Sequence, residues 1–266
     1  MNKMTEHRDG MVYFIGAGPG DPELLTLRAK AILERADVVV YTDSLVSDAV
    51  LRFARSDAKI YGSSALTLED ITAILVGAAS QGKIVARLHT GDPSLYGALS
   101  EQMVALERRG VKYEIVPGVS SLFAAAATLR IGLTAPGVSQ TVIIARHPGR
   151  TAVPESERLR DLAAHGATLA VFLSAGMIEQ VVQELLEGGY TGDTPAAVVH
   201  RASWPDQQVI RGALANLAQL VREAGIKNQA IILVGRALDA ALPGSDARSK
   251  LYDVMFGHGR RQARQL

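Results

Sequence analysis

The 266-residue chain is expected to form two linked α/β domains with mostly parallel or mixed sheets. Short apolar, β-branched runs alternate with longer segments of helical periodicity, which is the pattern of strands followed by helices. The strands read as continuous apolar runs, as expected where helices cover both faces of a sheet. A turn-rich stretch at 134–139 separates two such cycles. The domains are therefore predicted over 11–137 and 138–248, followed by a tail over 249–266.

Each predicted strand ends in a turn, and the segment that follows it has helical spacing. After the apolar run 11–16, for example, Leu24, Leu27 and Ala31 repeat at nearly helical intervals. The first cycle is expected to contain strands over 11–16, 38–41, 84–88 and 113–116 and helices over 23–36, 68–81, 96–109 and 122–129. The second is expected to contain strands over 141–144, 169–173, 196–199 and 230–234 and helices over 178–186 and 214–223.

Composition excludes several classes of site. The chain has no cysteine, which rules out disulfides, thiolate catalysis and cysteine-ligated metals, and no metal site is expected. With 28 basic and 27 acidic residues the net charge is +1, so nucleic acid is not an expected partner. No apolar run approaches the roughly 18 residues of a membrane span, and the polar segment 1–10 reads as a loose leader. We therefore expect a cytoplasmic protein without a membrane partner.

The first glycine-rich loop, Gly16 to Asp21, follows the first predicted strand and reads G-A-G-P-G-D. The dinucleotide-binding fingerprint G-x-G-x-x-G needs a glycine where this chain has Asp21. Pro19 removes an amide donor from the loop, and an acid disfavours a nearby pyrophosphate. The loop is therefore not expected to bind phosphate. Asp21 followed by Pro22 also fits a capped turn at the start of a helix.

Two further loops follow strands of the same domain, and open α/β sheets bind ligands at the carboxyl ends of their strands. The loop from Thr90 to Gly97 contains Asp92, which can accept hydrogen bonds from a ribose or an ammonium group or cap the next helix. The loop 117–121 contains Ser120 and Ser121, each a helix cap, a ligand contact or both. Three such loops without a phosphate-binding motif predict one shared ligand cleft.

Together the three loops resemble those of the tetrapyrrole (corrin/porphyrin) methyltransferase family. The similar segments are G-A-G-P-G-D, then A-R-L-H-T-G-D-P-S-L-Y-G over 86–97, then P-G-V-S-S over 117–121. The resemblance extends from about Met11 to the last predicted strand. It implies two α/β domains that bind S-adenosylmethionine in the cleft between them, with no metal. It also implies a homodimer acting on a small-molecule tetrapyrrole.

Three shorter segments resemble the C11-methylating branch of that family: Y-T-D-S-L-V over 41–46, A-S-W-P-D over 202–206 and S-K-L-Y-D over 249–253. They imply methyl transfer to C11 of precorrin-4, or of cobalt-precorrin-4, in cobalamin biosynthesis. The alternatives are a sister methyltransferase for another carbon (on uroporphyrinogen III, or at C17 or C20) and a non-catalytic tetrapyrrole carrier. An RNA-methylating relative of the fold is disfavoured by the balanced charge.

The resemblance also implies a set of site residues. Expected cofactor contacts are Pro19, Thr90, Gly91, Asp92, Leu95, Ser120 and Ser121 from the first domain, and Leu173, Ser174, Ala202, Ala230 and Ile231 from the second. Glu101 matches an acid in the helix after the G-D-P loop. With Asp43 it is a candidate catalytic residue. The chain departs from the uroporphyrinogen-methylating branch at Ala98, where that branch has an arginine.

Several polar residues near the strand ends have two interpretations each. Asp43 can move a proton or hydrogen-bond a pyrrole N–H, or it can cap a turn. Arg87 and His89 can meet ring carboxylates, although Arg87 equally fits an ion pair with a neighbouring acid. Trp204 can stack on the macrocycle or pack between domains. A methyl transfer to an electron-rich carbon needs no side-chain nucleophile, and no catalytic triad is expected.

Overall fold

The computed structural model describes residues 10–239, 249 and 253–262. Contacts between Cα atoms divide the chain into two compact units, one up to Ala124 together with Arg201–Asp206 and the other formed by the remainder. The division falls within a helix, earlier than the boundary expected after Gly137. Its later residues bond to the second unit: Thr128 to Gln207, and the Leu129 carbonyl to Arg211.

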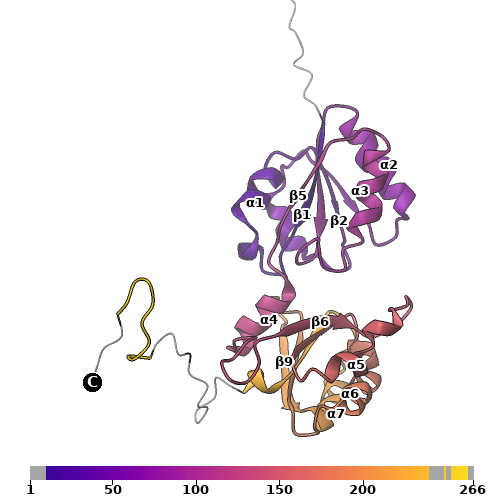
Figure 1. Cartoon of the computed structure of the whole chain (residues 1–266). Helices are drawn as coiled ribbons and strands as arrows, with labels where there is room; N and C mark the ends of the chain where they lie inside the picture. Colours follow the sequence, from indigo (N-terminus) through magenta and orange to yellow (C-terminus); the bar gives the residue numbers. More distant parts are fainter. Residues whose placement is uncertain (1–9, 240–248, 250–252, 263–266) are drawn as a thin grey trace, which may run out of the picture. The chain divides into compact units, whose positions relative to one another are not determined.

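The first unit contains a sheet of five parallel strands in the order β3-β2-β4-β1-β5 (Figure 1). Its strands are β1 (Met11–Gly16), β2 (Val38–Tyr41), β3 (Lys59–Gly62), β4 (Ile84–His89) and β5 (Tyr113–Val116). Its helices are α1 (Leu27–Leu33), α2 (Leu68–Ala79) and α3 (Leu99–Glu107). Buried residues of α1 join one hydrophobic cluster with the sheet, and those of α2 and α3 join another. The parallel sheet with helices on both faces is thus confirmed for this unit.

The second unit contains a mixed sheet in the order β6-β7-β10-β8-β9, in which β6 and β7 are parallel and the remaining pairs antiparallel. Its strands are β6 (Val142–Arg146), β7 (Thr168–Phe172), β8 (Pro195–His200), β9 (Gln208–Ala213) and β10 (Ala230–Val234). Its helices α5 (Leu159–Ala163), α6 (Ile178–Glu187) and α7 (Leu214–Glu223) share one hydrophobic cluster. The helix α4 (Ser121–Leu129) precedes this unit and contains the division between the two.

The structure contains two strands and one helix that the apolar pattern did not predict: β3, β9 and α5. Both strands lie at the edge of a sheet, and all four residues of β3 are exposed. An edge strand buries too little surface to require a continuous apolar run. The helix α5 spans only five residues, too few to establish a helical period.

Two predicted helices begin later than expected. The helix expected over 23–36 is a 3₁₀ turn at Pro22–Leu24 followed by α1, whose amino end is capped by Thr26. The helix expected over 96–109 begins only at Leu99, because Tyr96 and Ala98 adopt left-handed conformations with φ of 54° and 46°. Such φ values are unusual for residues with a side chain, and they interrupt a helix.

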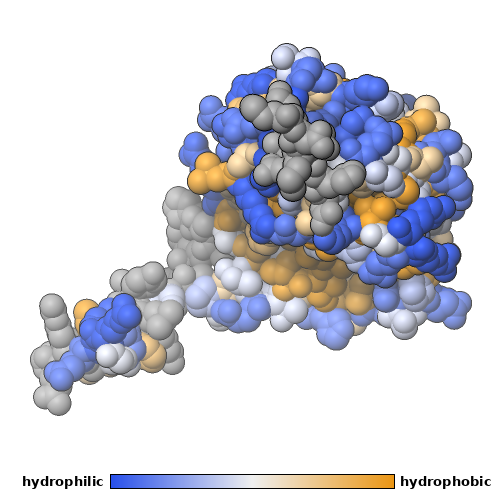
Figure 2. Space-filling model, turned by 90° about the horizontal axis from the view of Figure 1, so that it is seen from above, coloured by the Kyte–Doolittle hydropathy of each residue, from blue (hydrophilic) through white to orange (hydrophobic). Residues whose placement is uncertain are grey.

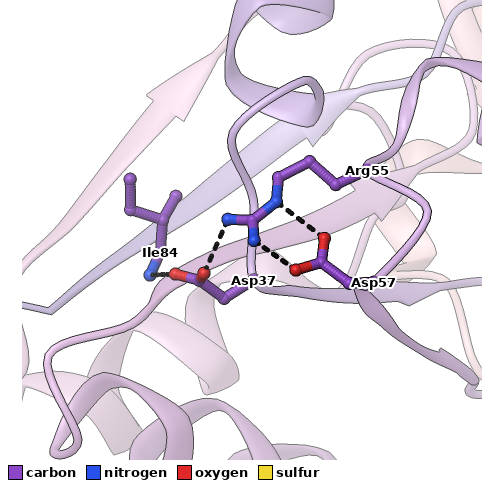
Figure 3. Close-up of polar contacts among 4 residues, drawn as sticks. All are labelled: Asp37, Arg55, Asp57 and Ile84. Carbon is purple, nitrogen blue, oxygen red and sulfur yellow. Dashed lines mark hydrogen bonds and ion pairs between the residues drawn. The ribbon is translucent and has the colours of Figure 1, made fainter.

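A polar cluster links the amino ends of strands in the first sheet (Figure 3). Asp37, just before β2, accepts a hydrogen bond from the backbone N–H of Ile84 at 2.9 Å, which joins the starts of β2 and β4. Arg55 donates to Asp37 at 3.0 Å and to Asp57 at 2.9 Å, across the turn before β3. These bonds tie the turn before β3 to the starts of β2 and β4, at the amino ends of the strands.

Hydrophilic side chains cover most of the surface seen in Figure 2, with hydrophobic residues gathered in smaller patches. Among the described residues, none of the helices is long and apolar enough to cross a membrane. Residues 1–9 of the segment 1–10, which is expected to be a leader, and Lys250 to Tyr252 of the S-K-L-Y-D segment lie outside the described residues.

Candidate functional site

The three glycine loops meet at the carboxyl ends of β1, β4 and β5, which are neighbouring strands of the first sheet. Gly18 and Gly91 form an antiparallel bridge, with the Gly91 N–H donating to the Gly18 carbonyl at 2.8 Å. A Cβ atom on Gly118 would lie 2.2 Å from the Gly91 carbonyl oxygen and 2.7 Å from the Gly16 Cα. Only glycine permits this approach of three backbones. The three loops thus come together in the fold, and the ligand cleft that they are expected to share stays a prediction.

Asp92 fastens the second loop to the third. Its Oδ2 accepts a hydrogen bond from the Gly118 backbone N–H at 2.9 Å, and its Oδ1 accepts from the Ser94 N–H and hydroxyl at 2.9 and 2.5 Å. Burial would raise the pKa of the Asp92 carboxyl, but these hydrogen bonds outweigh burial and lower the pKa below its usual value. Asp92 is thus a fixed, ionised carboxylate among the glycine loops.

The first glycine loop has few amides left for a phosphate. The Ala17 N–H donates to the His89 carbonyl at 2.8 Å, the Gly18 N–H to Gly91 at 3.3 Å and the Asp21 N–H to the Ser203 hydroxyl at 3.0 Å. Pro19 has no N–H. The expectation that this loop does not bind phosphate agrees with this bonding. The Asp21 side chain caps the following turn by accepting from the Glu23 N–H at 2.8 Å.

A segment distant in sequence, Arg201–Asp206, lies on the first glycine loop. The Trp204 indole Nε1 donates to the Pro19 carbonyl at 2.8 Å, and a Cβ on Gly20 would lie 2.1 Å from the Trp204 ring. The Arg201 guanidinium lies over the Trp204 ring, with its Cζ 4.9 Å from the ring centroid. Trp204 therefore packs on the Pro19 loop, and Ala202, expected to belong to the second domain, is grouped by its contacts with the first unit.

The two candidate catalytic acids are both exposed but are held differently. Asp43 accepts hydrogen bonds from the Ser64 N–H and hydroxyl, both at 2.7 Å, and these bonds lower the pKa of the Asp43 carboxyl. Ser64 follows β3, so the absence of β3 from the predicted strands hid this contact. Glu101 lies in the first turn of α3, on the wall of a cavity that Thr42 also lines.

Arg87 and His89 are buried on β4, beside that cavity. Arg87 donates from Nε to Gln102 Oε1 and from Nη1 to the Ser63 hydroxyl, both at 3.1 Å. The ion pair considered for Arg87 is not formed with any described acid. Burial lowers the pKa of Arg87 to about 10, so it remains charged at neutral pH. Burial and the Arg87 charge lower the pKa of His89 to about 3, so its ring is neutral.

The depressed pKa of His89 is expected to make the protein less stable in acid. In the unfolded chain the pKa of a histidine is about 6.5, against about 3 in the folded protein. Between these values the unfolded state binds the extra proton, so the His89 contribution is complete above pH 6.5 and is lost as the pH falls toward 3. We expect about 2 kcal/mol less His89-dependent stability at pH 5 than at pH 7.5. Urea unfolding of the native chain and of His89→Gln at both pH values measures this difference, and equal pH dependence in the two proteins would contradict it.

The site residues expected from the second domain, apart from Ala202, lie at strand ends of the second unit. Leu173 follows β7 in a left-handed conformation, φ 55°, with its side chain 62% exposed. Ser174 is fully buried, accepting from the His147 N–H at 2.9 Å and donating to the Phe172 carbonyl at 2.6 Å. Ala230 and Ile231 begin β10, and Ile231 is buried. The buried Ser174 hydroxyl positions the β7 turn, and the exposed Leu173 is its accessible side chain.

The family model Tetrapyrrole (Corrin/Porphyrin) Methylases matches residues 11–218. The chain belongs to this family. A cobalt-precorrin-4 C(11)-methyltransferase of Methanocaldococcus jannaschii is 52% identical over 252 residues, which cover 95% of this chain and 96% of that protein. A solved cobalt-precorrin-4 methyltransferase matches with a TM-score of 0.85 at 45% identity, covering 90% of this chain and 100% of that chain.

A third match relates this tetrapyrrole methylase to a structure with a cofactor product bound. Uroporphyrin-III C-methyltransferase of Thermus thermophilus, in complex with S-adenosylhomocysteine, matches with a TM-score of 0.73 at 33% identity, covering 86% of this chain and 93% of that one. Tetrapyrrole methylases use S-adenosylmethionine as the methyl donor.

The chemistry of the glycine loops in this tetrapyrrole methylase suits that cofactor. None of the three loops contains a lysine or arginine, whereas the ionised Asp92 lies among them. A carboxylate is matched to the positive ammonium and sulfonium groups of S-adenosylmethionine and opposed to a phosphate. Thr90 is exposed at the end of β4, and Ser121 is the first residue of α4, whose next amides already bond to Ser120.

Proposed function

We propose that this chain transfers the methyl group of S-adenosylmethionine to C11 of precorrin-4, or of its cobalt-bearing counterpart, in cobalamin biosynthesis. The observation that carries the proposal is the 52% identity with a cobalt-precorrin-4 C(11)-methyltransferase over 95% of this chain. The structural likeness to a solved cobalt-precorrin-4 methyltransferase supports it. The three segments that resemble the C11-methylating branch, which begin at Tyr41, Ala202 and Ser249, favour this ring carbon over others.

The reaction makes modest demands on side chains. S-adenosylmethionine supplies an already activated methyl group, and the electron-rich ring carbon of the substrate displaces it in line. The protein must align the two partners and keep water from the sulfonium, and alignment alone accounts for a large part of such a rate enhancement. The close backbone packing of Gly16, Gly91 and Gly118 in the first unit and the fixed carboxylate of Asp92 suit this positioning role.

The proposed cofactor contacts are those implied by the family resemblance. They are Pro19, Thr90, Gly91, Asp92, Leu95, Ser120, Ser121 and Ala202 in the first unit and Leu173, Ser174, Ala230 and Ile231 in the second. Backbone groups of the glycine loops and exposed side chains such as Thr90 and Leu173 would meet the cofactor. The buried hydroxyls of Ser120 and Ser174 would act by shaping their turns.

Asp43 and Glu101 are proposed to act on the substrate. The hydrogen bonds from Ser64 keep Asp43 ionised, which suits acceptance of a hydrogen bond from a pyrrole N–H; because the lowered pKa also makes the carboxylate a weaker base, it favours this role over proton transfer. Glu101 faces the cavity beside β4, where it can meet an edge of the macrocycle. The proposal further includes a homodimer in the cytoplasm, with neither nucleic acid nor membrane as a partner. The net charge of +1 supports the exclusion of nucleic acid.

The test supplies the purified protein with S-adenosylmethionine carrying a ¹³C-methyl group and, in separate reactions, with precorrin-4, cobalt-precorrin-4, each other precorrin and uroporphyrinogen III. We expect the label at C11, located by NMR, in the product of precorrin-4 or of cobalt-precorrin-4. Label at C17 or C20, or transfer to uroporphyrinogen III only, would assign the chain to a sister reaction. A carrier would bind the tetrapyrrole without transferring label, and calorimetric titration with S-adenosylhomocysteine would then give no binding.

A further inference from the structure

A cavity of about 390 Å³ opens in the first unit where β2, β3 and β4 end. Its walls are largely apolar and include Leu45, Leu68, Ile71 and Leu95, from both the loops and α2. Four buried polar residues also line it: Ser63, Arg87, His89 and Gln102. An apolar pocket with a few convergent polar groups is the usual form of a small-ligand site.

Arg87 brings an uncompensated charge to this cavity. Its residue is only 5% exposed, and its hydrogen bonds run to Gln102, to the Ser63 hydroxyl and to two backbone carbonyls, all neutral acceptors. Within the described part of the chain Arg87 forms no ion pair, and its Nη2 forms no hydrogen bond. A buried cation is costly unless an anion neutralises it. The guanidinium is therefore held in place by neutral groups, with one nitrogen left to donate.

His89 adds a second unsatisfied atom. The residue is 4% exposed, its ring packs against Phe14, and no hydrogen bond reaches its Nε2 among the described residues. Buried polar atoms without a partner are rare in native proteins. Glu101 also lines the cavity, but its side chain is exposed, so water screens its charge far more than that of Arg87.

We infer that this cavity binds a carboxylate of the tetrapyrrole substrate, with the Arg87 guanidinium as the donor. The inference rests on the proposed function, whose substrate carries acetate and propionate arms. The apolar walls suit the methylene stem of such an arm, and the buried guanidinium suits its end. His89 is followed directly by Thr90 and Gly91 of the glycine loops. An arm held here would therefore fix the macrocycle next to the proposed cofactor contacts.

The methionyl carboxylate of S-adenosylmethionine has the same chemistry, so the experiment must separate the two sources. We compare the native chain with Arg87→Gln and Arg87→Lys, measuring kcat, KM for the tetrapyrrole and Kd for S-adenosylhomocysteine by calorimetry. For Arg87→Gln we expect KM for the tetrapyrrole to rise about tenfold or more, as loss of a charge-assisted hydrogen bond implies. The Kd for S-adenosylhomocysteine should change less than about twofold. In Arg87→Lys the KM for the tetrapyrrole should rise less, because lysine keeps the positive charge but lacks the paired donors of the guanidinium.

A surface variant keeps the inference testable if Arg87→Gln fails to fold. Leu68 is 39% exposed at the cavity wall, and Leu68→Glu places a repelling carboxylate there. Its matched control is Leu186→Glu on α6 in the second unit, where the leucine is 37% exposed. Only Leu68→Glu should raise KM for the tetrapyrrole, and thermal unfolding should be alike in both.

Two results would overturn the inference. If the native chain methylates C11 but Leu68→Glu and a folded Arg87→Gln leave KM for the tetrapyrrole unchanged, the cavity does not bind the substrate and the proposed function still stands. If Arg87→Gln weakens S-adenosylhomocysteine binding instead, the carboxylate belongs to the cofactor. Failure of the native chain to methylate either precorrin would refute the proposed function itself.

Discussion

Replacing Gly118 with alanine is expected to destabilise the protein severely and to abolish tight cofactor binding. The new Cβ would lie 2.2 Å from the Gly91 carbonyl oxygen and 2.7 Å from the Gly16 Cα, and both are backbone atoms that cannot rotate away. The three loops would have to separate. We expect the free energy of unfolding to fall by about 3 kcal/mol, as for a severely overpacked interior. The Kd for S-adenosylhomocysteine should rise at least about tenfold.

The matched control for this substitution is Gly77→Ala in α2. A Cβ on Gly77 would meet nothing within 4 Å, and the helical backbone accepts alanine readily. This variant should be neutral or more stable by about 0.5–1 kcal/mol, with unchanged affinity. Urea unfolding and calorimetry measure both quantities. If Gly118→Ala bound S-adenosylhomocysteine as tightly as Gly77→Ala, the loop crossing would have no part in the site.

The second large effect is expected at Asp92. In Asp92→Ala, the Gly118 N–H, the Ser94 N–H and the Ser94 hydroxyl lose their acceptors. The Ser94 donors are exposed and can bond to water, but leaving the partly buried Gly118 N–H unpaired should cost about 2 kcal/mol of stability. The third loop would no longer be tied to the second, so Kd for S-adenosylhomocysteine should rise about tenfold or more. Asp92→Asn keeps one acceptor oxygen, so its stability and its Kd for S-adenosylhomocysteine should lie between those of the native chain and of Asp92→Ala.

Asp70→Ala controls for a general loss of stability. Asp70 accepts from the Thr67 N–H in the capping box of α2, so its removal should cost about 1 kcal/mol. The affinity of Asp70→Ala for S-adenosylhomocysteine should stay at the native value. A parallel loss of affinity in Asp70→Ala and Asp92→Ala would show that destabilisation, and not the loop contact, weakens binding. The Asp92 contribution should persist at neutral pH and fade in acid, because the folded pKa lies below the unfolded one.

The sequence predicted the central strands well, because burial on both faces requires a continuous apolar run. The inner strands β1, β2 and β10 have their predicted bounds, whereas the edge strands β3 and β9 expose at least half of their residues and carry no such pattern. The consequence reaches the site, because Ser64, which holds Asp43, follows β3. The start of α3 was misplaced for a different reason. The positive φ values of Tyr96 and Ala98 are imposed by their surroundings and leave no mark in apolar periodicity.

Local sequence patterns were enough to indicate the family, to place three glycine loops at strand ends and to argue against a phosphate-binding motif. These follow from local facts: strand ends, glycine positions, Pro19 and Asp21. The tertiary structure decided which partners those residues have. It pairs Trp204 with Pro19 across 185 positions, ties Asp92 to Gly118, and leaves Arg87 buried without a described acid. Such contacts join segments far apart in the chain, and only the folded backbone sets the distances that make them possible.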